Sequence, residues 1–287
     1  MKSKIRPLVF ACLACSGTLF AQQTFDLQGH RGARARYPEN TLPAFAHAVE
    51  CGCTTLELDL AVSKDSVLIV SHEPWLRPGL CIGPDGLLVG SSGSYPLFEM
   101  PASVIGTCDC GSLLDPRFPD AARQAVPKPT FDAVVQSVPD SLRFNIEIKF
   151  RPEWVDSLHP SAETFAALVR NAIVVHGLSR RVIVQSFSPE ALRTLHALAP
   201  EIPTSFLLEH RTSLRLIPRE LGYIPEVISP AARFVTSGFI RKARRMHMQV
   251  LPWTVNDEAE FRRLVHLGVD GIITDDPCRM VPFVPRP

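Results

Sequence analysis

The chain has 287 residues, of which 46% are hydrophobic, and its 30 basic and 29 acidic side chains leave a formal net charge of +1. This length and apolar content suffice for one large barrel or two ordinary domains. The even charge balance excludes the large electrostatic field that attracts nucleic acids or acidic membrane surfaces, so we expect no nucleic-acid partner.

The first 21 residues are typical of a signal peptide rather than of the folded domain. A basic start precedes the apolar run Leu8–Phe20, and Ala21 ends a favourable cleavage site. The run is too short for a membrane span. We therefore expect an exported protein, periplasmic or secreted, with no transmembrane segment once the signal peptide is removed. The alternative is a lipoprotein anchored at Cys12 or Cys15.

Six cysteines remain in the mature chain, namely Cys51, Cys53, Cys81, Cys108, Cys110 and Cys278. An oxidising compartment permits disulfides, but six cysteines allow many pairings and the sequence leaves the choice open. Two of the pairs are separated by a single residue, which is not the C-x-x-C spacing of a zinc or redox site. We expect the cysteines to be structural.

The folded domain begins with an apolar strand, Phe25–Gln28, which leads into the polar stretch Gln28–Thr41. Two glycines bracket His30 and Arg31 there, and glycine lets a backbone approach a ligand closely. An imidazole transfers protons near neutral pH, and a guanidinium binds phosphate with paired hydrogen bonds. The stretch therefore predicts an anion site. The alternative is a turn with two solvated polar residues.

A helix and a hairpin are expected next. Apolar residues at helical spacing predict a helix over 41–51, and Thr55–Val62 and Val67–Ser71 are typical of two strands joined by a turn. Residues 74–128 then lose this periodicity and carry 8 of the 26 prolines. We interpret them as an irregular insertion.

Strands and helices alternate from residue 130 onward. Helix starts are expected at Ser161, at Ser188 and at Asn256–Glu258. The predicted strands are Arg143–Phe150, Arg181–Phe187, Thr204–Glu209, Glu226–Ser229, Gln249–Val255 and Asp270–Thr274. With the two earlier strands, this makes eight strands, each followed by a helix or by the insertion. The pattern predicts one TIM-barrel domain over residues 22–287 with the insertion at 74–128. A doubly wound open sheet is the alternative.

Polar side chains fall at the carboxyl ends of the predicted strands, where TIM barrels keep their catalytic groups. Residues i and i+2 of a strand share a face, so Glu57 lies on the same side as Asp59, and Glu147 on the same side as Lys149. Three converging carboxylates predict a hard, oxygen-rich site for one divalent metal ion, Ca²⁺ or Mg²⁺. The alternative is a structural ion-pair network around Lys149. Other polar residues at these strand ends are Gln185, Ser186, Asp275 and Asp276.

An ordered set of short motifs spans nearly the whole mature chain. The motifs are His30-Arg31-Gly32, Pro38-Glu39-Asn40-Thr41, Glu57-Leu58-Asp59, Ser71-His72, Ile146-Glu147-Ile148-Lys149, Gln185-Ser186-Phe187, Trp253-Thr254-Val255-Asn256 and Asp270-Gly271-Ile272-Ile273-Thr274-Asp275-Asp276-Pro277. In this set and this order the chain resembles the glycerophosphodiester phosphodiesterase family. The resemblance implies a TIM barrel and metal-dependent hydrolysis of small-molecule glycerophosphodiesters to glycerol 3-phosphate and an alcohol.

The resemblance also implies roles for individual residues. His30 and His72 act as general acid and base, and Arg31 and Lys149 contact the phosphate. The implied metal ligands are Glu57, Asp59 and Glu147. The implied supporting residues are Glu39, Asn40 and Gln185. We add the hypothesis that a glycerol hydroxyl attacks the phosphorus and forms a cyclic phosphate before water opens it.

Residues at the mouth of the expected pocket are open to two interpretations. Trp253 either packs against the glycerol carbons of the substrate or belongs to the core, and Phe187 is expected in the core. Glu73 follows His72 where the family usually has aspartate. We therefore expect the insertion to form one wall of the pocket and to influence which alcohol is accepted.

Two other functions stay open at this point. A phospholipase C- or D-like enzyme of the same barrel acts on intact lipids and needs an apolar rim. The insertion offers Tyr95, Leu97, Phe98 and Met100 for such a rim. A non-catalytic barrel that binds phosphate-bearing ligands explains less of the pattern, because both histidines, the three acids and the lysine are all present.

Overall fold

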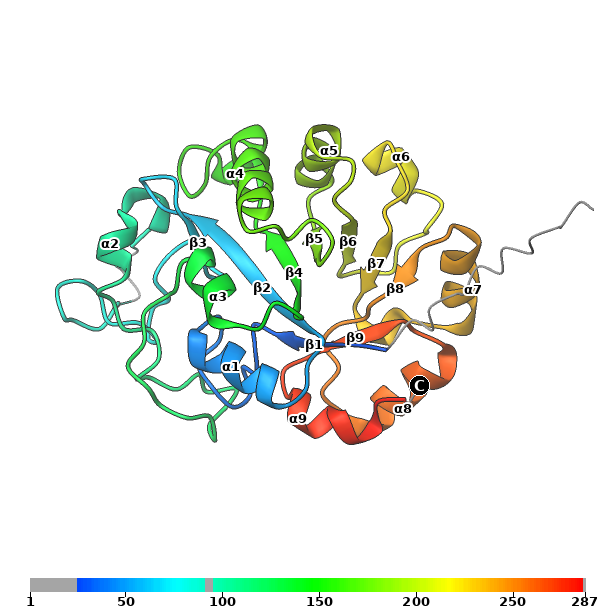
Figure 1. Ribbon diagram of the computed structural model, residues 1–287, viewed down its shortest axis with the longest axis horizontal. Helices are drawn as coiled ribbons and strands as arrows, with labels where there is room; N and C mark the ends of the chain where they lie inside the picture. The colour runs from blue at the N-terminus through cyan, green and yellow to red at the C-terminus, as the bar shows by residue number, and fades with distance from the viewer. Residues whose placement is uncertain (1–24, 91–94, 286–287) are drawn as a thin grey trace, which may run out of the picture.

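The protein is described by a computed structural model that covers residues 25–90 and 95–285. The predicted signal peptide, with its cleavage site and both candidate anchor cysteines, lies outside these residues. The described chain forms a ring of parallel strands with helices on its outside (Figure 1). None of the helices in this part of the chain has the length and apolar character that a membrane crossing requires.

Eight parallel strands of the described chain make the barrel wall, in the spatial order β8-β7-β6-β5-β4-β2-β1-β9. They are β1 (Asp26–His30), β2 (Thr55–Val62), β4 (Arg143–Ile148), β5 (Val182–Ser186), β6 (Thr204–Leu208), β7 (Val227–Pro230), β8 (Gln249–Val250) and β9 (Gly271–Thr274). The short β3 (Leu68–Val70) pairs antiparallel with β2, as the predicted hairpin requires.

The two end strands of this order, β8 and β9, are joined by backbone hydrogen bonds near and beyond the short β8. The N–H of Asp270 donates to Val250 O at 3.1 Å, and the N–H of Ile273 donates to Pro252 O at 3.0 Å. The predicted strand Gln249–Val255 stops early because Pro252 has no N–H to donate to a ladder. The TIM barrel is confirmed, and the open doubly wound sheet is wrong.

Helices follow most of the strands. They are α1 (Leu42–Glu50), α2 (Ala102–Ile105), α3 (Phe131–Ser137), α4 (Ala162–Val175), α5 (Pro189–Leu198), α6 (Ile217–Leu221), α7 (Ser237–Arg245), α8 (Glu258–Leu267) and α9 (Pro277–Met280). Short 3₁₀ turns are η1 (Leu97–Glu99), η2 (Pro152–Trp154), η3 (Ala232–Phe234) and η4 (Val281–Phe283). Ser161, Ser188 and Asp257 are side-chain N-caps, so the predicted helix starts are confirmed.

The main hydrophobic core lies between the strands and the surrounding helices. Leu58 of β2 is fully buried in this core, which also contains Phe45 of α1 and Phe165 of α4. Alternate residues of the same strand face the other way, because a strand repeats every two residues. Glu57 and Asp59 are therefore turned toward the interior of the barrel, where they are buried as well.

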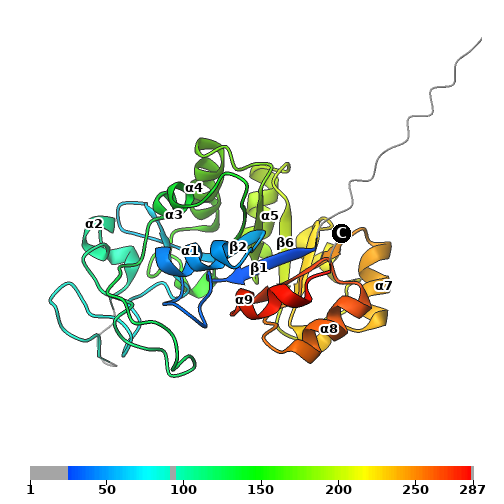
Figure 2. The ribbon, with the colours of Figure 1, turned by 60° about the horizontal axis from the view of Figure 1, so that its bottom comes forward.

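The insertion after β3 folds as a lobe of its own beside α1, on the far side of the molecule from α7 (Figure 2). Its residues pack with Ala61 of β2 and Ile69 of β3 in a second hydrophobic core, and the disulfide Cys81–Cys110 fastens the insertion internally. Leu97 and Met100 belong to this core and are buried. The expected lipid-facing rim is therefore wrong for these two residues, because the lobe uses them for its own packing.

A second disulfide joins distant parts of the chain. Cys51 at the end of α1 is bonded to Cys278 in α9, across a sequence separation of 227 residues. Cys53 and Cys108 are buried and form no disulfide within residues 25–90 and 95–285. The first and last βα units of the barrel are thus covalently connected.

Candidate active site

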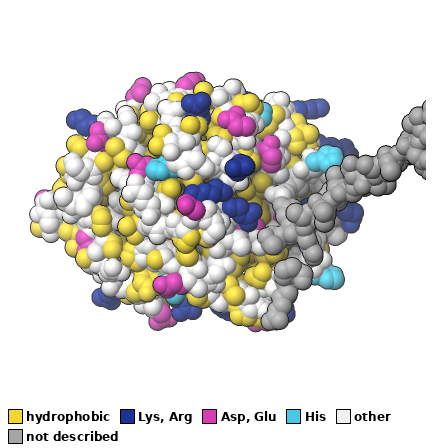
Figure 3. All heavy atoms as spheres, in the orientation of Figure 1, with side chains coloured by type: hydrophobic (Ala, Val, Ile, Leu, Met, Phe, Trp, Pro, Cys, Tyr) yellow, Lys and Arg dark blue, Asp and Glu magenta, His cyan; other side chains and the backbone are white. Residues whose placement is uncertain are grey.

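A pocket of about 990 Å³ opens at the carboxyl ends of the barrel strands. The residues predicted from the sequence that line it are His30, Arg31, Glu57, His72, Glu147, Lys149, Gln185 and Trp253. The other three predicted residues, Glu39, Asn40 and Asp59, lie behind this lining and contact it. In the orientation of Figure 1, basic and acidic side chains gather near the middle of the face in front of β4 and β5 (Figure 3).

The turn after β1 aims Arg31 at the acids of β2. Gly32 has a φ of +82°, and a Cβ at this position would lie 2.6 Å from the backbone of α1, so only glycine fits. The Arg31 N–H donates to Glu57 Oε2 at 2.9 Å. Its guanidinium donates to both carboxylate oxygens of Glu39 at 3.0 Å and lies 3.3 Å from Asp59. Glu39 therefore fixes Arg31 at the wall of the pocket.

Three carboxylates from two neighbouring strands converge at the base of the pocket. One oxygen from each of Glu57, Asp59 and Glu147 lies within 4.8 Å of the others, and all three side chains are buried. The parallel register places Asp59 beside Glu147. Lys149 Nζ bridges these two acids, 2.8 Å from Glu147 and 3.0 Å from Asp59. The cluster that the i, i+2 spacing predicts is present, and so is the ion pair of the alternative interpretation.

Amide side chains hold the outer oxygens of this cluster. Asn40 Nδ2 donates to Asp59 Oδ2 at 2.8 Å, and Gln185 Nε2 donates to Glu57 Oε1 at 2.9 Å. Asn145 fixes the orientation of the second amide by donating to Gln185 Oε1 at 3.1 Å. These contacts place Asn40 and Gln185 as supports of the carboxylates.

The electrostatics of the cluster show a shortage of positive charge. Burial, together with repulsion from Asp59 and Glu147, raises the pKa of Glu57. Burial also raises the pKa of Glu147, against the opposing charge of Lys149. Burial acts in the same sense on Asp59, but Lys149 and Arg31 outweigh it and hold the pKa of Asp59 well below its usual range.

The residues present fit a divalent cation. Their donor atoms are carboxylate oxygens, the hard ligands that Ca²⁺ and Mg²⁺ prefer. Asp59 Oδ1 is buried and receives no well-directed hydrogen bond from the described residues, although the Lys149 ammonium lies 3.0 Å away. Asp59 Oδ1 thus lacks a hydrogen-bond donor, and the raised pKa of the neighbouring Glu57 shows that its ionised form is unfavourable. Both observations indicate a position for a further positive charge.

His30 at the end of β1 is oriented by an acid from the other end of the chain. Its Nδ1 lies 2.6 Å from Asp275 Oδ1, directly after β9. Burial lowers the pKa of His30 to about 4, although the hydrogen bond to Asp275 acts in the opposite sense. Asp275 itself stays ionised, because the favourable effect of His30 and Arg34 exceeds the cost of burial and holds its pKa below the usual range. The Nδ1–H of His30 therefore donates, and Nε2 is left for chemistry.

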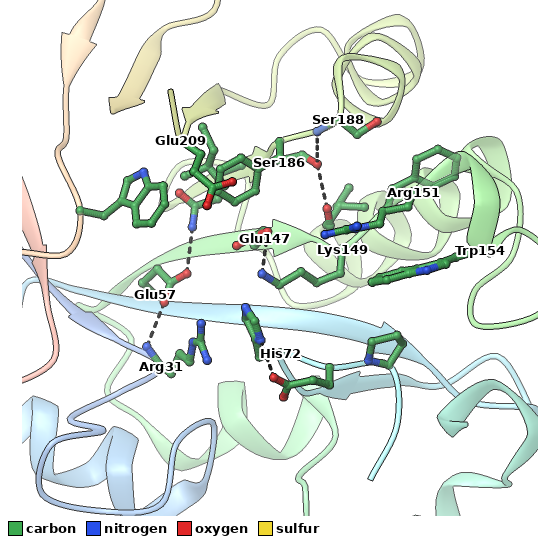
Figure 4. A pocket seen from close by; sticks show the side chains of 18 of the residues that line it. Arg31, Glu57, His72, Glu147, Lys149, Arg151, Trp154, Ser186, Ser188 and Glu209 are labelled. Carbon is green, nitrogen blue, oxygen red and sulfur yellow. Dashed lines mark hydrogen bonds and ion pairs between the residues drawn. The ribbon is translucent and has the colours of Figure 1, made fainter. Parts of the chain in front are cut away.

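His72 has a partner of the same kind. Its Nδ1 lies 3.0 Å from Glu73 Oε1, and burial of Glu73 is outweighed by this hydrogen bond and by the charge of His72, so that the pKa of Glu73 falls to about 2. His72 lies in the same pocket as Glu57, Glu147 and Lys149 (Figure 4). Glu73, which departs from the expected family pattern, is thus in contact with the histidine and orients it.

Sequence reasoning left Asp275 without a role. It placed this residue at the carboxyl end of the last strand, and a carboxylate at that position in a TIM barrel was the available signal. Trp154, on the loop after β4, was missed altogether and also lines the pocket. No strand or motif points to it, because it lies on the 3₁₀ turn η2.

The aromatic residues depart from expectation in part. Trp253 lines the pocket, and its indole N–H donates to Ser229 O at 2.8 Å, so one residue combines a satisfied N–H with a place in the pocket lining. Phe187 is 40% exposed and meets Trp253 edge to face at 5.6 Å between ring centroids. The expectation that Phe187 lies in the core is wrong, because it follows the last paired residue of β5 and turns into the pocket.

Known proteins resemble this chain over most of its length. A glycerophosphodiester phosphodiesterase of Bacillus subtilis (strain 168) is 27% identical over 271 residues, covering 92% of this chain and 88% of the relative. A lysophospholipase D of Rattus norvegicus is 26% identical, covering 89% of this chain and 84% of the relative. The crystal structure of a glycerophosphodiester phosphodiesterase from Agrobacterium tumefaciens str. C58 superposes with a TM-score of 0.68 at 26% identity, covering 88% of this chain and 97% of that one.

A family model supports the same relationship. The model of the glycerophosphoryl diester phosphodiesterase family matches residues 30–279, which include the first and the last of the residues that shape the pocket. The match therefore begins at the last residue of β1 and extends over the other barrel strands and the insertion. This chain belongs to the glycerophosphoryl diester phosphodiesterase family, whose enzymes hydrolyse glycerophosphodiesters.

Proposed function

We propose that this protein hydrolyses small glycerophosphodiesters to glycerol 3-phosphate and an alcohol with the help of one divalent metal ion and two catalytic histidines. The observation that carries the proposal is the buried cluster of Glu57, Asp59 and Glu147, which shares its pocket with His30 and His72. A phosphodiester is an anion, and the cluster needs further positive charge before it can accept one.

The two histidines supply the proton transfers. One accepts the proton of a glycerol hydroxyl through Nε2 while that oxygen forms a bond to phosphorus. The bond from phosphorus to the other alcohol breaks, and the departing oxygen takes a proton from the second histidine. Water then opens the cyclic phosphate with the two roles reversed, which yields glycerol 3-phosphate. Proton transfers of this kind contribute roughly 10²- to 10⁴-fold each.

The remaining charged groups act on the phosphate. Lys149 and Arg31 both line the pocket beside the carboxylates and attract the non-bridging oxygens. A divalent cation held by Glu57, Asp59 and Glu147 supplies the positive charge that stabilises the more highly charged transition state. Phosphorus NMR under slowed turnover tests for the cyclic phosphate intermediate. Its absence at every time point would favour direct attack by water.

The first experiment measures glycerol 3-phosphate release with EDTA, with Ca²⁺ and with Mg²⁺. We expect release only with a metal, and a loss of about 100-fold or more in His30→Ala. His266→Ala is the matched control, because His266 is an exposed residue of α8 outside the pocket. Undiminished release in EDTA contradicts the metal requirement. Tight binding of a substrate without any turnover in the presence of metal would instead support a non-catalytic barrel.

We also propose that the protein is exported. The signal-peptide pattern supports this, and so do two disulfides, which form readily in oxidising compartments. Determination of the mature N-terminus after expression with the complete leader tests the proposal. A first residue of Gln22 is the expected result. A lipid-modified cysteine at the mature N-terminus would instead show that the protein is an anchored lipoprotein.

A second candidate substrate is a lysophospholipid, because the lysophospholipase D named above resembles this chain over most of its length. Burial of Leu97 and Met100 counts against it, since it removes half of the apolar rim expected for a lipid surface. Assays with lysophosphatidylcholine in mixed micelles separate the two candidates. Faster release from the lysolipid than from the water-soluble diesters would favour the second.

A further inference from the structure

The pocket extends to both sides of the carboxylate cluster. Glu209 lies on one side of Glu57, Glu147 and Lys149, and Trp154 lies on the other (Figure 4). The first side, the inner lobe, is walled by barrel residues that include Leu207, Phe187, Trp253 and Ile273. The second side, the outer lobe, is walled by Trp75 of the insertion and by Arg151, Glu153 and Trp154 of the loop after β4.

The two lobes differ in how they are bounded. In the inner lobe, Leu207 and Ile273 are buried parts of the barrel strands, while Phe187 and Glu209 are exposed; in the outer lobe, Arg151 and Glu153 are 62% and 64% exposed at their side chains. The glycerol half of the substrate is the same in every glycerophosphodiester and suits the lobe made by the barrel. The outer lobe is left for the alcohol that departs, and His72 stands beside it, two residues before Pro74 and three before Trp75.

The outer lobe is already organised without a ligand. His159 is buried and accepts the N–H of Arg151 at Nε2, 3.0 Å away, while its Nδ1–H donates to Pro160 O at 2.8 Å. The same imidazole packs on Phe150 at 4.7 Å between ring centroids. These contacts hold the loop that carries Trp154. The aromatic wall is therefore preorganised, which reduces the entropic cost of binding.

The chemistry of the outer lobe matches an uncharged alcohol. Trp75 and Trp154 meet edge to face at 5.8 Å, and the Arg151 guanidinium lies 4.7 Å from the Trp154 ring. That ring face is already satisfied by a cation, which would repel a second one. Arg151 is in turn 3.8 Å from Glu153, and Glu73 is paired with His72, so each of these two acids already has a basic neighbour.

We propose that the outer lobe binds the leaving alcohol and selects uncharged, polyhydroxylated alcohols, such as inositol or glycerol, over cationic amino alcohols. The flat tryptophan surfaces contact the carbon skeleton of a polyol. Arg151 and Glu153 attract each other at 3.8 Å without a hydrogen bond, so the guanidinium can donate to the hydroxyl groups of the polyol and the carboxylate can accept from them. This inference rests on the proposed glycerophosphodiester hydrolysis and specifies the alcohol that it releases.

The test compares glycerol 3-phosphate release from four substrates with metal present. These are the diesters of glycerol phosphate with inositol, glycerol, choline and ethanolamine. We expect the wild-type kcat/KM for the inositol and glycerol esters to exceed that for the two cationic esters. Release from none of the four contradicts the proposed function, and this inference with it. Release with the choline ester preferred contradicts the inference alone.

Variants on the two sides then locate the alcohol. Trp154→Ala should lower kcat/KM for the inositol ester by about 3- to 10-fold more than for the ethanolamine ester, the worth of one aromatic contact. Arg151→Glu should raise kcat/KM for the choline ester relative to kcat/KM for the inositol ester. Phe187→Ala, in the inner lobe, should lower kcat/KM for all four substrates alike, because Phe187 contacts the glycerol half that they share.

A matched control guards against a non-specific effect of charge. Arg180→Glu removes an exposed arginine outside the pocket and should leave the substrate ranking unchanged. Thermal melts confirm that each variant is folded. An unchanged ranking in both Trp154→Ala and Arg151→Glu would overturn the inference. So would a changed ranking in Phe187→Ala, because it would place the alcohol in the inner lobe.

Discussion

Replacing Asp275 with asparagine tests the claim that this residue orients His30. Asp275 accepts three side-chain hydrogen bonds at 2.6 Å each, from His30 Nδ1 and Arg34 Nε on Oδ1 and from Asn256 Nδ2 on Oδ2. Asn256 cannot turn over, because its own Oδ1 accepts the backbone N–H of Asp275 at 2.9 Å. An amide at position 275 has one acceptor oxygen where three donors need two. In either orientation an N–H group faces another N–H group.

The magnitude follows from this geometry. A buried donor that loses its acceptor costs about 1–3 kcal/mol, and 1.4 kcal/mol is about a factor of ten. If His30 turns or changes tautomer to avoid the clash, the loss falls on proton transfer. We therefore expect kcat of Asp275→Asn to drop roughly 10- to 100-fold. KM should change little, because the groups that contact the phosphate are unaltered.

The assay is glycerol 3-phosphate release under saturating metal, with kcat and KM determined separately. Asp276→Asn is the control, because Asp276 is the neighbouring acid, caps α9, pairs with Arg36 at 2.7 Å and has no hydrogen bond or ion pair to a histidine of the described chain. Asparagine is also a good N-cap, so this variant should keep wild-type activity. A wild-type kcat for Asp275→Asn in a protein that melts normally would refute the orienting role. An equal loss in Asp276→Asn would show that the effect is not specific to the histidine.

Three further predictions concern stability. Contact with His72 lowers the pKa of Glu73 to about 2, despite the burial of Glu73. The ionised carboxylate of Glu73 therefore stabilises the fold above its ordinary pKa, and this stabilisation is lost as the pH falls from about 4.5 toward 2. Glu73→Gln should thus be less stable by up to about 3 kcal/mol near pH 5, and denaturant titrations should show the difference shrinking in that window; a constant difference would contradict the linkage. Ca²⁺ or Mg²⁺ at about 100 times its dissociation constant should stabilise the protein by about 2.7 kcal/mol, and Glu57→Gln should abolish the shift in Tm. A shift that persists in this variant would place the ion elsewhere. Removal of the Cys51–Cys278 bridge in Cys278→Ser should lower stability by about 2–5 kcal/mol, measured without reductant, and reduction of the wild type should lower it at least as much because it also opens Cys81–Cys110. Equal melting of the oxidised and reduced protein would contradict it.

The part of the fold that follows from local patterns is predictable from the sequence. The alternation of Leu58 with Glu57 and Asp59 indicates a strand with one apolar and one polar face, and both faces are as expected. Capping residues such as Ser188 mark helix starts within a few residues of where they occur. These signals are local, since they depend only on neighbours in the chain and on the periods of strand and helix.

Errors arose where a side chain depends on what packs against it. Phe187 continues an apolar strand in the sequence, yet the ladder of β5 ends before it and the ring turns into the pocket. Leu97 and Met100 occur in a stretch without periodicity, which gave no sign of a second core. Whether these two residues are exposed or buried depends on how the whole insertion folds, so no local pattern in the sequence predicts it.

The sequence by itself determined the barrel, the family and the acids that converge, because strand alternation and motif order are written along the chain. Only the tertiary structure decided the partners of those residues. His30 and Asp275 are 245 positions apart and meet because β1 lies beside β9 when the barrel closes. Trp75 and Trp154 meet because the insertion and the loop after β4 reach the same side of the pocket. Contacts of this kind depend on how the ring of strands closes, and closure is a property of the whole fold.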